Sequence, residues 1–353
     1  MGTESIEASF LSIFALISFF IFLIVSKHSY KIGNGVLLDK DFSKPQAFHL
    51  FPVTRSGGIA TILSLSIFFS IYYLIFSKIL YDYIFLSYSM FFIGFLDDLK
   101  INIKPFRRLL MMIFLLFVLI YFLPIQILYI DISLLSFISN NHFFSSVFVL
   151  LCFLFVINGA NLIDGFNGLL ALNLLIINII LTYINLNNSN LEFSILLISQ
   201  IVILLSFLLF NFPHAKIFLG DSGAYLMGSL IALNTIITNN LNPNISSFFF
   251  CTLLFYIFFE VFFSFFRKLK QNKSPIYPDN KHLHMLSYFK ISSYYGKYKA
   301  NYINSVIINL SYLILILPGL YLMNSPILSR YWFFILLLIY IIIYSRLYHL
   351  TKN

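Results

Sequence analysis

Long apolar runs separated by short polar segments dominate the chain from residue 8 to residue 345. A membrane-spanning helix needs about 20 mostly apolar residues, and the runs have about that length. We therefore predict an all-α integral membrane protein with a single polytopic domain, residues 1–353. The predicted spans lie near residues 8–26, 57–77, 79–96, 107–123, 143–162, 168–184, 193–211, 222–239, 246–266, 303–323 and 327–345.

This pattern predicts eleven spans, and the second and third are so close that they must form a hairpin. The last two are the least clearly separated, so ten spans is the alternative. Residues 8–26 lack a basic leading region and a cleavage site of small residues. We therefore interpret them as a retained first span and not as a signal peptide.

Composition supports a membrane location. Hydrophobic residues make up 60% of the chain and charged residues only 10%, whereas soluble proteins carry about 25% charged residues. Cys152 and Cys251 lie inside apolar runs, which favours packing over a disulfide or a zinc site. The net charge of +9 does not indicate nucleic acid, because in a membrane protein the location of charges matters more than their sum.

The basic residues predict the orientation of the chain. The connections 27–56, 97–108, 163–167, 212–221 and 267–302, with the tail after 345, hold all of the 22 Lys and Arg residues except Lys78 and Arg330. By the positive-inside rule these connections are cytoplasmic. The N-terminus is then outside and, with eleven spans, the C-terminus is inside.

Acidic residues gather on the same predicted side, at the ends of apolar runs. Three clusters stand out: Asp97-Asp98, the segment Asn158 to Asp164, and Gly220-Asp221. Carboxylates at membrane depth cost several kcal/mol and are a functional hypothesis by default. A single acid would fit a helix cap, but three clusters on one face do not.

These clusters suit phosphoryl transfer. Carboxylate and amide oxygens are ligands for Mg²⁺, which takes one or two carboxylates together with substrate phosphates. Basic residues in the same connections, among them Lys216 and Arg267, can neutralise phosphate oxygens. The predicted catalytic segments lie near residues 27–56, 97–108, 158–168, 211–223 and 267–302.

The longest of these connections contains His282 and His284. We interpret the pair as a contact for phosphate or sugar. A metal site and a plain solvated loop are the alternatives, and no cysteine or third histidine accompanies the pair to favour a metal.

Taken in order, these motifs resemble the polyprenyl-phosphate N-acetylhexosamine-1-phosphate transferases of glycosyltransferase family 4. The resemblance covers roughly residues 39 to 290. It rests on Asp41, His49 to Gly58, Gly94 to Asp98 with Pro105 and Arg108, Asn158 to Leu169, Asn211 to Gly223, and His282-Leu-His284. The eleven spans and the His-Leu-His loop are more similar to the GlcNAc-1-phosphate transferase branch than to the peptidoglycan branch.

The resemblance implies transfer of an N-acetylhexosamine-1-phosphate, such as GlcNAc-1-phosphate, from a UDP-sugar to undecaprenyl phosphate. UMP is released, Mg²⁺ is required with Mn²⁺ as the alternative ion, and the product starts a lipid-linked cell-surface polysaccharide such as O-antigen. The implied location is the bacterial cytoplasmic membrane with the active site facing the cytoplasm, and relatives of this kind are often homodimers.

The resemblance also implies roles for particular residues. Asp221 is the expected Mg²⁺ ligand, together with Asp97, which also orients or deprotonates the lipid phosphate. In-line displacement is favoured over a covalent intermediate. The expected further catalytic residues are Asp98, Asp164, His282 and His284, and the expected substrate-binding residues are His49, Arg55, Asn158, Asn161, Asn167, Lys216 and Arg267.

Two departures from the family pattern concern these positions. Asn167 and Glu260 each stand where many members have aspartate, so an ionised role for residue 167 is excluded.

The alternatives to GlcNAc-1-phosphate transfer are the function of the phospho-MurNAc-pentapeptide translocase of peptidoglycan synthesis and, from another class, that of a transporter or a structural protein. A transporter would place polar residues near the bilayer midplane in paired broken helices, whereas these acids lie at one face.

Overall fold

The computed structural model describes residues 3–31, 35–41, 48, 51–101, 103–123, 125–132, 141–274 and 279–351. The described chain is almost entirely helical and carries one two-stranded sheet, which confirms the predicted all-α class. In chain order the elements are α1 (Thr3–His28), β1 (Leu38–Asp39), β2 (Val53–Thr54), α2 (Gly57–Phe76), α3 (Tyr81–Asp98), α4 (Pro105–Phe122), α6 (His142–Ile163), α7 (Leu169–Asn187), α8 (Leu191–Asn211), α9 (Gly220–Leu241), α10 (Ser247–Leu253), α11 (Phe255–Lys270), α12 (Leu283–Leu322) and α13 (Pro326–Leu350).

A helix lies at each of the eleven predicted positions. Within the described residues, eight helices are long and apolar enough to cross a membrane, or nine if the bent pair α10 and α11 forms one span. That pair is bent by 76°. The two central helices α3 and α9 are not among the eight, and α3 carries three aspartates. The chain is thus a multi-pass membrane protein, and the count of eleven stays a prediction.

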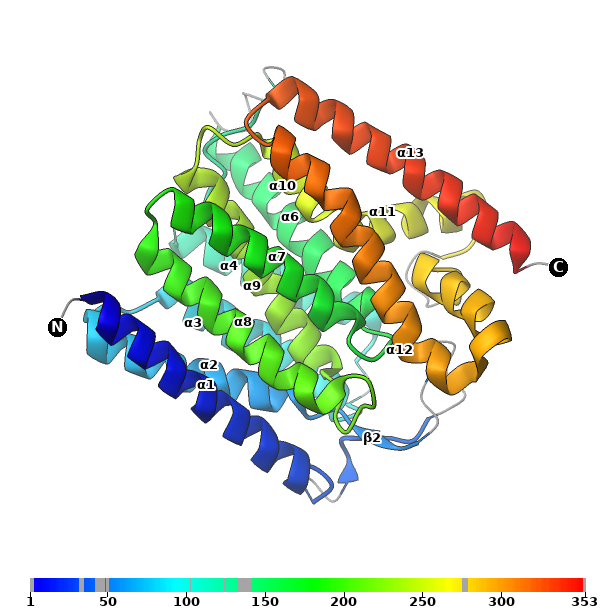
Figure 1. Ribbon diagram of the computed structural model, residues 1–353, viewed down its shortest axis with the longest axis horizontal. Helices are drawn as coiled ribbons and strands as arrows, with labels where there is room; N and C mark the ends of the chain where they lie inside the picture. Colours follow the sequence, from blue (N-terminus) through cyan, green and yellow to red (C-terminus); the bar gives the residue numbers. More distant parts are fainter. Residues whose placement is uncertain are drawn as a thin grey trace.

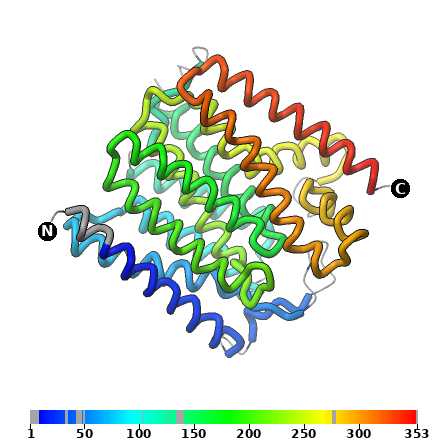
Figure 2. The backbone as a smooth tube through the Cα atoms, in the orientation of Figure 1, coloured from blue at the N-terminus to red at the C-terminus, as the bar shows by residue number. Residues whose placement is uncertain are grey.

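The bundle is built around α9, which packs against α2, α3, α6 and α7. Figure 1 shows α9 in the interior, with α1 and α13 on opposite edges of the molecule. Small residues such as Gly223, Ala224 and Gly228 leave α9 narrow, so neighbouring helices approach it closely, as small residues permit in membrane bundles. The tube view shows the same arrangement, with α12 and α13 running side by side (Figure 2).

A short ladder ties several predicted cytoplasmic connections together at one end of the bundle. β1 pairs antiparallel with β2, and Thr54 forms a parallel bridge with Ile217 from the connection between α8 and α9. The backbone N–H groups of Gly57 and Gly58 donate to the carbonyls of Phe218 and Leu219, each at 2.8 Å. These main-chain hydrogen bonds hold the starts of α2 and α9 next to each other.

The close approach of α3 and α9 depends on Gly94, and Gly94→Ala is expected to loosen it. A Cβ atom at this position would lie 2.4 Å from the backbone carbonyl of Asp221. Backbone cannot move aside as a flexible side chain can, so we expect a loss of about 1–3 kcal/mol. Thermal unfolding in detergent should show a lower midpoint for Gly94→Ala. Gly165→Ala is the matched control, because its added Cβ meets nothing within 4 Å; equal midpoints for the two variants would contradict this packing.

Candidate active site

The acidic clusters predicted from the sequence meet where three helices end or begin at the same end of the bundle. Asp97 and Asp98 close α3, Asp221 opens α9, and Asp164 follows the last residue of α6. Their proximity follows from the tight packing of α3 and α6 on α9. Figure 1 shows these helix ends on the side of the molecule that also carries the β-ladder.

Two arginines lie among the aspartates. The Arg108 Nη1 atom donates to Asp97 Oδ2 at 2.5 Å and to Asp221 Oδ2 at 3.1 Å. The Arg55 Nη1 atom lies 3.6 Å from Asp98 Oδ1 and 3.8 Å from Asp221 Oδ1. The carboxylate of Asp221 therefore lies between two guanidinium groups.

Asp98 differs from Asp97 in what it contacts. Its carboxylate accepts hydrogen bonds from the backbone N–H groups of Asp221 and Ser222, both at 3.0 Å, and from the Ser222 hydroxyl at 2.6 Å. These are the free donors at the start of α9, so Asp98 caps that helix. The Asp98 side chain is 0% exposed, whereas that of Asp97 is 27% exposed. Asp97 is therefore the member of the pair that can meet a substrate.

Asp164 lies in the same electrostatic environment. Burial, together with the negative charge of Asp221, raises the pKa of the Asp164 carboxyl to about 7. A carboxyl group that titrates near neutral pH can accept or give a proton during a reaction. Asp164 is therefore a candidate for acid–base chemistry beside Asp221.

Arg108 and Asp39 are site residues that were not among the predicted ones. Arg108 lies in the first turn of α4, and its place next to Asp97 was signalled only by its position after the Asp97-Asp98 motif. Asp39 accepts two hydrogen bonds from the Arg55 guanidinium, at 3.0 and 2.7 Å. It thereby holds Arg55 in the orientation that brings Nη1 towards Asp98 and Asp221.

Of the other predicted substrate-binding residues, Asn167 links two connections of the bundle. The Asn167 N–H donates to Asn301 Oδ1 and the Asn167 side chain donates to the Pro213 carbonyl, both at 2.8 Å. The Asn158 amide donates within its own helix to the Leu154 carbonyl. Lys216 is exposed on the connection before α9. His49 lies outside the described residues.

A small cavity opens beside these connections. It is lined by Phe48, Phe51, Val53, Asn167, Pro213, His214, Ala215, Phe218, Tyr298 and Asn301. His214 stacks on Tyr298 with ring centroids 5.0 Å apart and an interplanar angle of 13°. Aromatic faces combined with amide groups suit a flat polar ring, which the aromatic side chains can stack against and the amides can hydrogen-bond.

The segment that contains His282 and His284, here called the histidine loop, forms a second buried network with α11. His282 Nδ1 lies 3.1 Å from Glu260 Oε2, and His282 Nε2 lies 3.3 Å from Asp279 Oδ1. Asp279 also accepts hydrogen bonds from the Arg267 guanidinium at 2.6 and 3.2 Å. His284 is fully buried, and its Nδ1 lies 3.3 Å from the Tyr256 hydroxyl.

Three predicted site residues lie in this network. We expected His282 and His284 to contact phosphate or sugar and Arg267 to bind substrate, and these roles stay predictions. The structure buries all three side chains and gives each a protein partner, because residues 279–284 pack against α11. The buried His284 Nε2 atom has no hydrogen-bond partner among the described residues. In this arrangement the three residues shape the loop next to Phe166, which lies 5.9 Å from His284 between ring centroids.

His282→Ala is expected to lower stability more than it alters substrate affinity. The change leaves the buried Glu260 Oε2 atom without the donor that now faces it, at a cost of about 1–3 kcal/mol, whereas Asp279 keeps its hydrogen bonds from Arg267. The melting temperature and the rate of proteolysis after Lys270 and Lys273 measure this effect. His142→Ala, an exposed histidine at the other end, is the control and should change stability by less than about 0.5 kcal/mol. A raised KM with an unchanged melting temperature would contradict the structural role.

Comparison with known proteins confirms the resemblance over the central part of the chain. Residues 80–239 match glycosyl transferase family 4. An undecaprenyl-phosphate alpha-N-acetylglucosaminyl 1-phosphate transferase of Thermotoga maritima is 31% identical over 156 residues, 43% of this chain and 45% of that protein. A phospho-N-acetylmuramoyl-pentapeptide-transferase of Streptococcus thermophilus is 31% identical over 153 residues, 41% of this chain and 44% of that protein. The matched segments span less than half the length of these relatives.

Proposed function

We propose that the chain transfers a sugar-1-phosphate, an N-acetylhexosamine-1-phosphate such as GlcNAc-1-phosphate, from a UDP-sugar to undecaprenyl phosphate and releases UMP. The observation that carries the proposal is the convergence of Asp97, Asp164 and Asp221 with two arginines at one end of the bundle. The matched family segment contains all three aspartates, and the two relatives are named as 1-phosphate and pentapeptide transferases.

The reaction is an in-line displacement in this proposal. An oxygen of the undecaprenyl phosphate forms a bond to the β-phosphorus of the UDP-sugar, and the bond from that phosphorus to the bridging oxygen breaks. The bonding electron pair leaves with UMP. Asp97, the exposed carboxylate of its pair, orients or deprotonates the acceptor phosphate, and Arg55 and Arg108 stabilise negative charge on the phosphate oxygens.

Mg²⁺ fits the chemistry of this site. Within the described residues no three carboxylate, imidazole or thiol groups converge as a complete metal site. Two carboxylates, those of Asp97 and Asp221, do converge on one cation, the Arg108 guanidinium. Mg²⁺ takes one or two carboxylates plus substrate phosphates, so Asp97 and Asp221 would hold it. The ion would supply charge neutralisation at the diphosphate when bound, with Mn²⁺ as the alternative ion.

The membrane context follows from the same proposal. The end of the bundle that holds the aspartate cluster also carries the basic connections. By the positive-inside rule, this end lies on the cytoplasmic face of a bacterial inner membrane. The polyprenyl chain stays in the bilayer while its phosphate reaches the site. The cavity lined by Phe218 and Asn167 is the proposed place for the uracil ring of the donor. We also propose that the protein forms a homodimer.

Pentapeptide transfer in peptidoglycan synthesis is the second candidate, because several relatives carry that name. Donor choice separates the two candidates. Purified protein is incubated with undecaprenyl phosphate, Mg²⁺ and either a UDP-N-acetylhexosamine or UDP-MurNAc-pentapeptide, and UMP release is measured.

We expect UMP release from a UDP-N-acetylhexosamine, loss of release with EDTA, and recovery when excess Mg²⁺ is added. Release only from the pentapeptide donor would assign the second candidate. No release from any donor, by protein that is monodisperse and unfolds cooperatively, would contradict the proposed reaction.

A further inference from the structure

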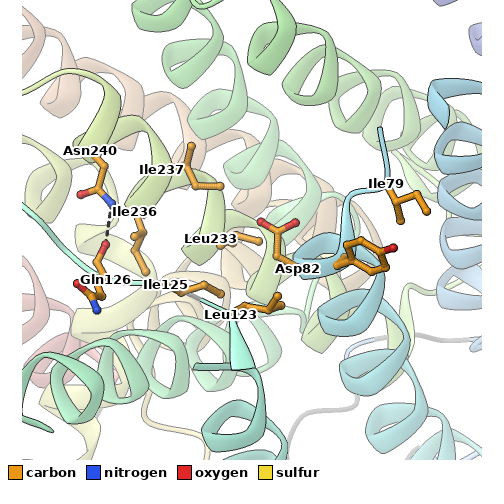
Figure 3. A pocket seen from close by; sticks show the side chains of 10 residues that line it. Ile79, Asp82, Leu123, Ile125, Gln126, Leu233, Ile236, Ile237 and Asn240 are labelled. Carbon is orange, nitrogen blue, oxygen red and sulfur yellow. Dashed lines mark hydrogen bonds between the residues drawn. The ribbon is translucent and has the colours of Figure 1, made fainter. Parts of the chain in front are cut away.

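A second cavity lies at the opposite end of the bundle from the aspartate cluster. It has a volume of about 270 Å³ and is shown in Figure 3. Its walls come from the start of α3, the end of α9 and the segment after α4. The lining residues are Ile79, Tyr81, Asp82, Leu123, Ile125, Gln126, Leu233, Ile236, Ile237 and Asn240. Because α3 and α9 carry the site aspartates at their other ends, this cavity is separate from the candidate active site.

Asp82 is the one charged group among the residues that line this cavity. Its Oδ1 atom accepts a hydrogen bond from the Tyr83 N–H at 2.9 Å. Among the described residues, no Lys, Arg or His lines the cavity and no cation pairs with Asp82. The nearest basic residue in sequence, Lys78, is paired with Glu192 at 2.7 Å. The sequence at 124 and 133–140 contains no basic residue either.

A first-turn aspartate complements the dipole of its own helix, and this accounts for one carboxylate oxygen. It does not account for an apolar cavity beside the carboxylate. Figure 3 shows Asp82 beside Leu233, with Ile237 also facing the space. Apolar walls disfavour the ionised form of a carboxyl group, and a cation bound beside it stabilises that form. An ionisable residue at the edge of a membrane helix is therefore a candidate site.

The rim of the cavity is held in a fixed shape. The Asn240 side chain donates to the Gln126 carbonyl at 2.6 Å and accepts from the Leu128 N–H at 2.9 Å. These bonds fasten the segment after α4 across the end of α9, so the walls around Leu123 and Ile125 are preformed. A pocket of this kind, mostly apolar with a few fixed polar groups, is the usual form of a small-molecule site.

We propose that this cavity binds a small amphiphilic monocation, a primary ammonium group attached to a short apolar body. The ammonium pairs with Asp82 beside the ring of Tyr81, an aromatic group that also attracts cations. The apolar body lies against Leu233, Ile236 and Ile237. A volume of 270 Å³ equals roughly nine water molecules of about 30 Å³, which suits a ligand of about ten non-hydrogen atoms.

The charge at this end of the bundle favours a cation over an anion. The predicted outer connections and helix ends carry Lys78 and Arg330 as their only basic residues. They carry the acidic residues Glu4, Glu7, Asp82, Asp131 and Glu192. The net negative balance is opposite to that of the whole chain, so the local field attracts positive ligands.

The test uses 2-phenylethylamine, which is protonated at pH 7.5, and its neutral analogue 2-phenylethanol. Dissociation constants are measured by titration calorimetry on full-length protein in a neutral detergent. We expect saturable binding of the amine, binding of the alcohol at least tenfold weaker, and a loss of at least tenfold in amine affinity in Asp82→Asn. Partitioning of the amine into detergent is the same for all variants and cancels between them, and the alcohol titration is corrected with its own partition coefficient measured in protein-free micelles.

Glu192→Gln is the matched control, because it removes one negative charge at the same end without lining the cavity. Its amine affinity should stay within twofold of the wild type. If Asp82→Asn does not fold, Ile79→Trp replaces it: Ile79 is a rim residue, 45% exposed, and the indole fills the cavity without changing charge. Equal affinity for amine and alcohol, an unchanged affinity in both cavity variants, or no saturable binding would overturn the proposal.

Discussion

Asp221→Asn is expected to lower the rate of UMP release by about a thousandfold, the upper range for loss of one main electrostatic contact in a catalytic site. The Asp221 carboxylate lies between Arg55 and Arg108 and is the expected ligand for the divalent ion. Asparagine has nearly the same size but lacks the charge. The backbone N–H of residue 221 still donates to Asp98, so the start of α9 stays capped.

The melting temperature of Asp221→Asn should lie at or a few degrees below that of the wild type. The lost charge faces Arg55 and Arg108, which costs some stability, but the two arginines keep Asp39 and Asp97 as partners. Asp82→Asn makes the same substitution at the far end of the bundle and should keep the wild-type rate. A rate within tenfold of wild type for Asp221→Asn would remove this residue from the catalytic centre.

Asp98→Ala is expected to reduce stability by about 2–4 kcal/mol, the sum of a lost helix cap and of donors left without an acceptor in a buried place. Its carboxylate accepts three hydrogen bonds at the start of α9 and is 0% exposed. Loss of this cap should also displace Asp221, so the rate falls together with the melting temperature.

Asp97→Asn is the comparison that separates the two neighbouring carboxylates. Among the described residues, Asp97 makes no hydrogen bond with the α9 backbone. Its side chain is 27% exposed beside Arg108. The Asp97 variant should therefore lose activity with a melting temperature within a few degrees of wild type. Thermal unfolding and UMP release on the same preparations test the pair, and equal melting temperatures for Asp97→Asn and Asp98→Ala would contradict the capping role.

The helices were predictable because each coincides with an apolar run of about 20 residues. The bend between α10 and α11 was not. It falls at Leu254, inside the mostly apolar run 246–266, with no Pro or Gly to mark it. The early start of α12 was also missed, because residues 283–302 carry many polar side chains and follow a polar loop. These residues are helical on both sides of Gly296, where the helix is broken.

The convergence of the aspartates was predictable in part, since all of the clusters lie at helix ends on one predicted face. What each carboxylate contacts was not predictable, because it depends on how helices far apart in sequence pack. Asp98 caps α9 only because Gly94 lets α3 approach it. Asp39 orients Arg55 only because β1 pairs with β2.

The histidine loop shows the limit of motif reasoning most clearly. Two histidines in a polar, basic connection predict an exposed contact for phosphate. Burial of His282 between Glu260 and Asp279 requires the loop to fold onto α11 and α13, where Tyr340 also donates to Glu260 at 2.8 Å. Neither the spacing nor the charge of the sequence contains that information.

The most direct test of the proposed reaction follows the β-phosphorus of the donor. A UDP-N-acetylhexosamine that carries radioactive phosphorus at the β position is incubated with undecaprenyl phosphate, Mg²⁺ and purified protein, and both products are separated. Sugar-1-phosphate transfer predicts that all of the transferred label appears in the lipid, with one unlabelled UMP released for each labelled lipid. Label that stays in water-soluble UDP while sugar alone reaches the lipid, or label released as a free sugar phosphate, would contradict it.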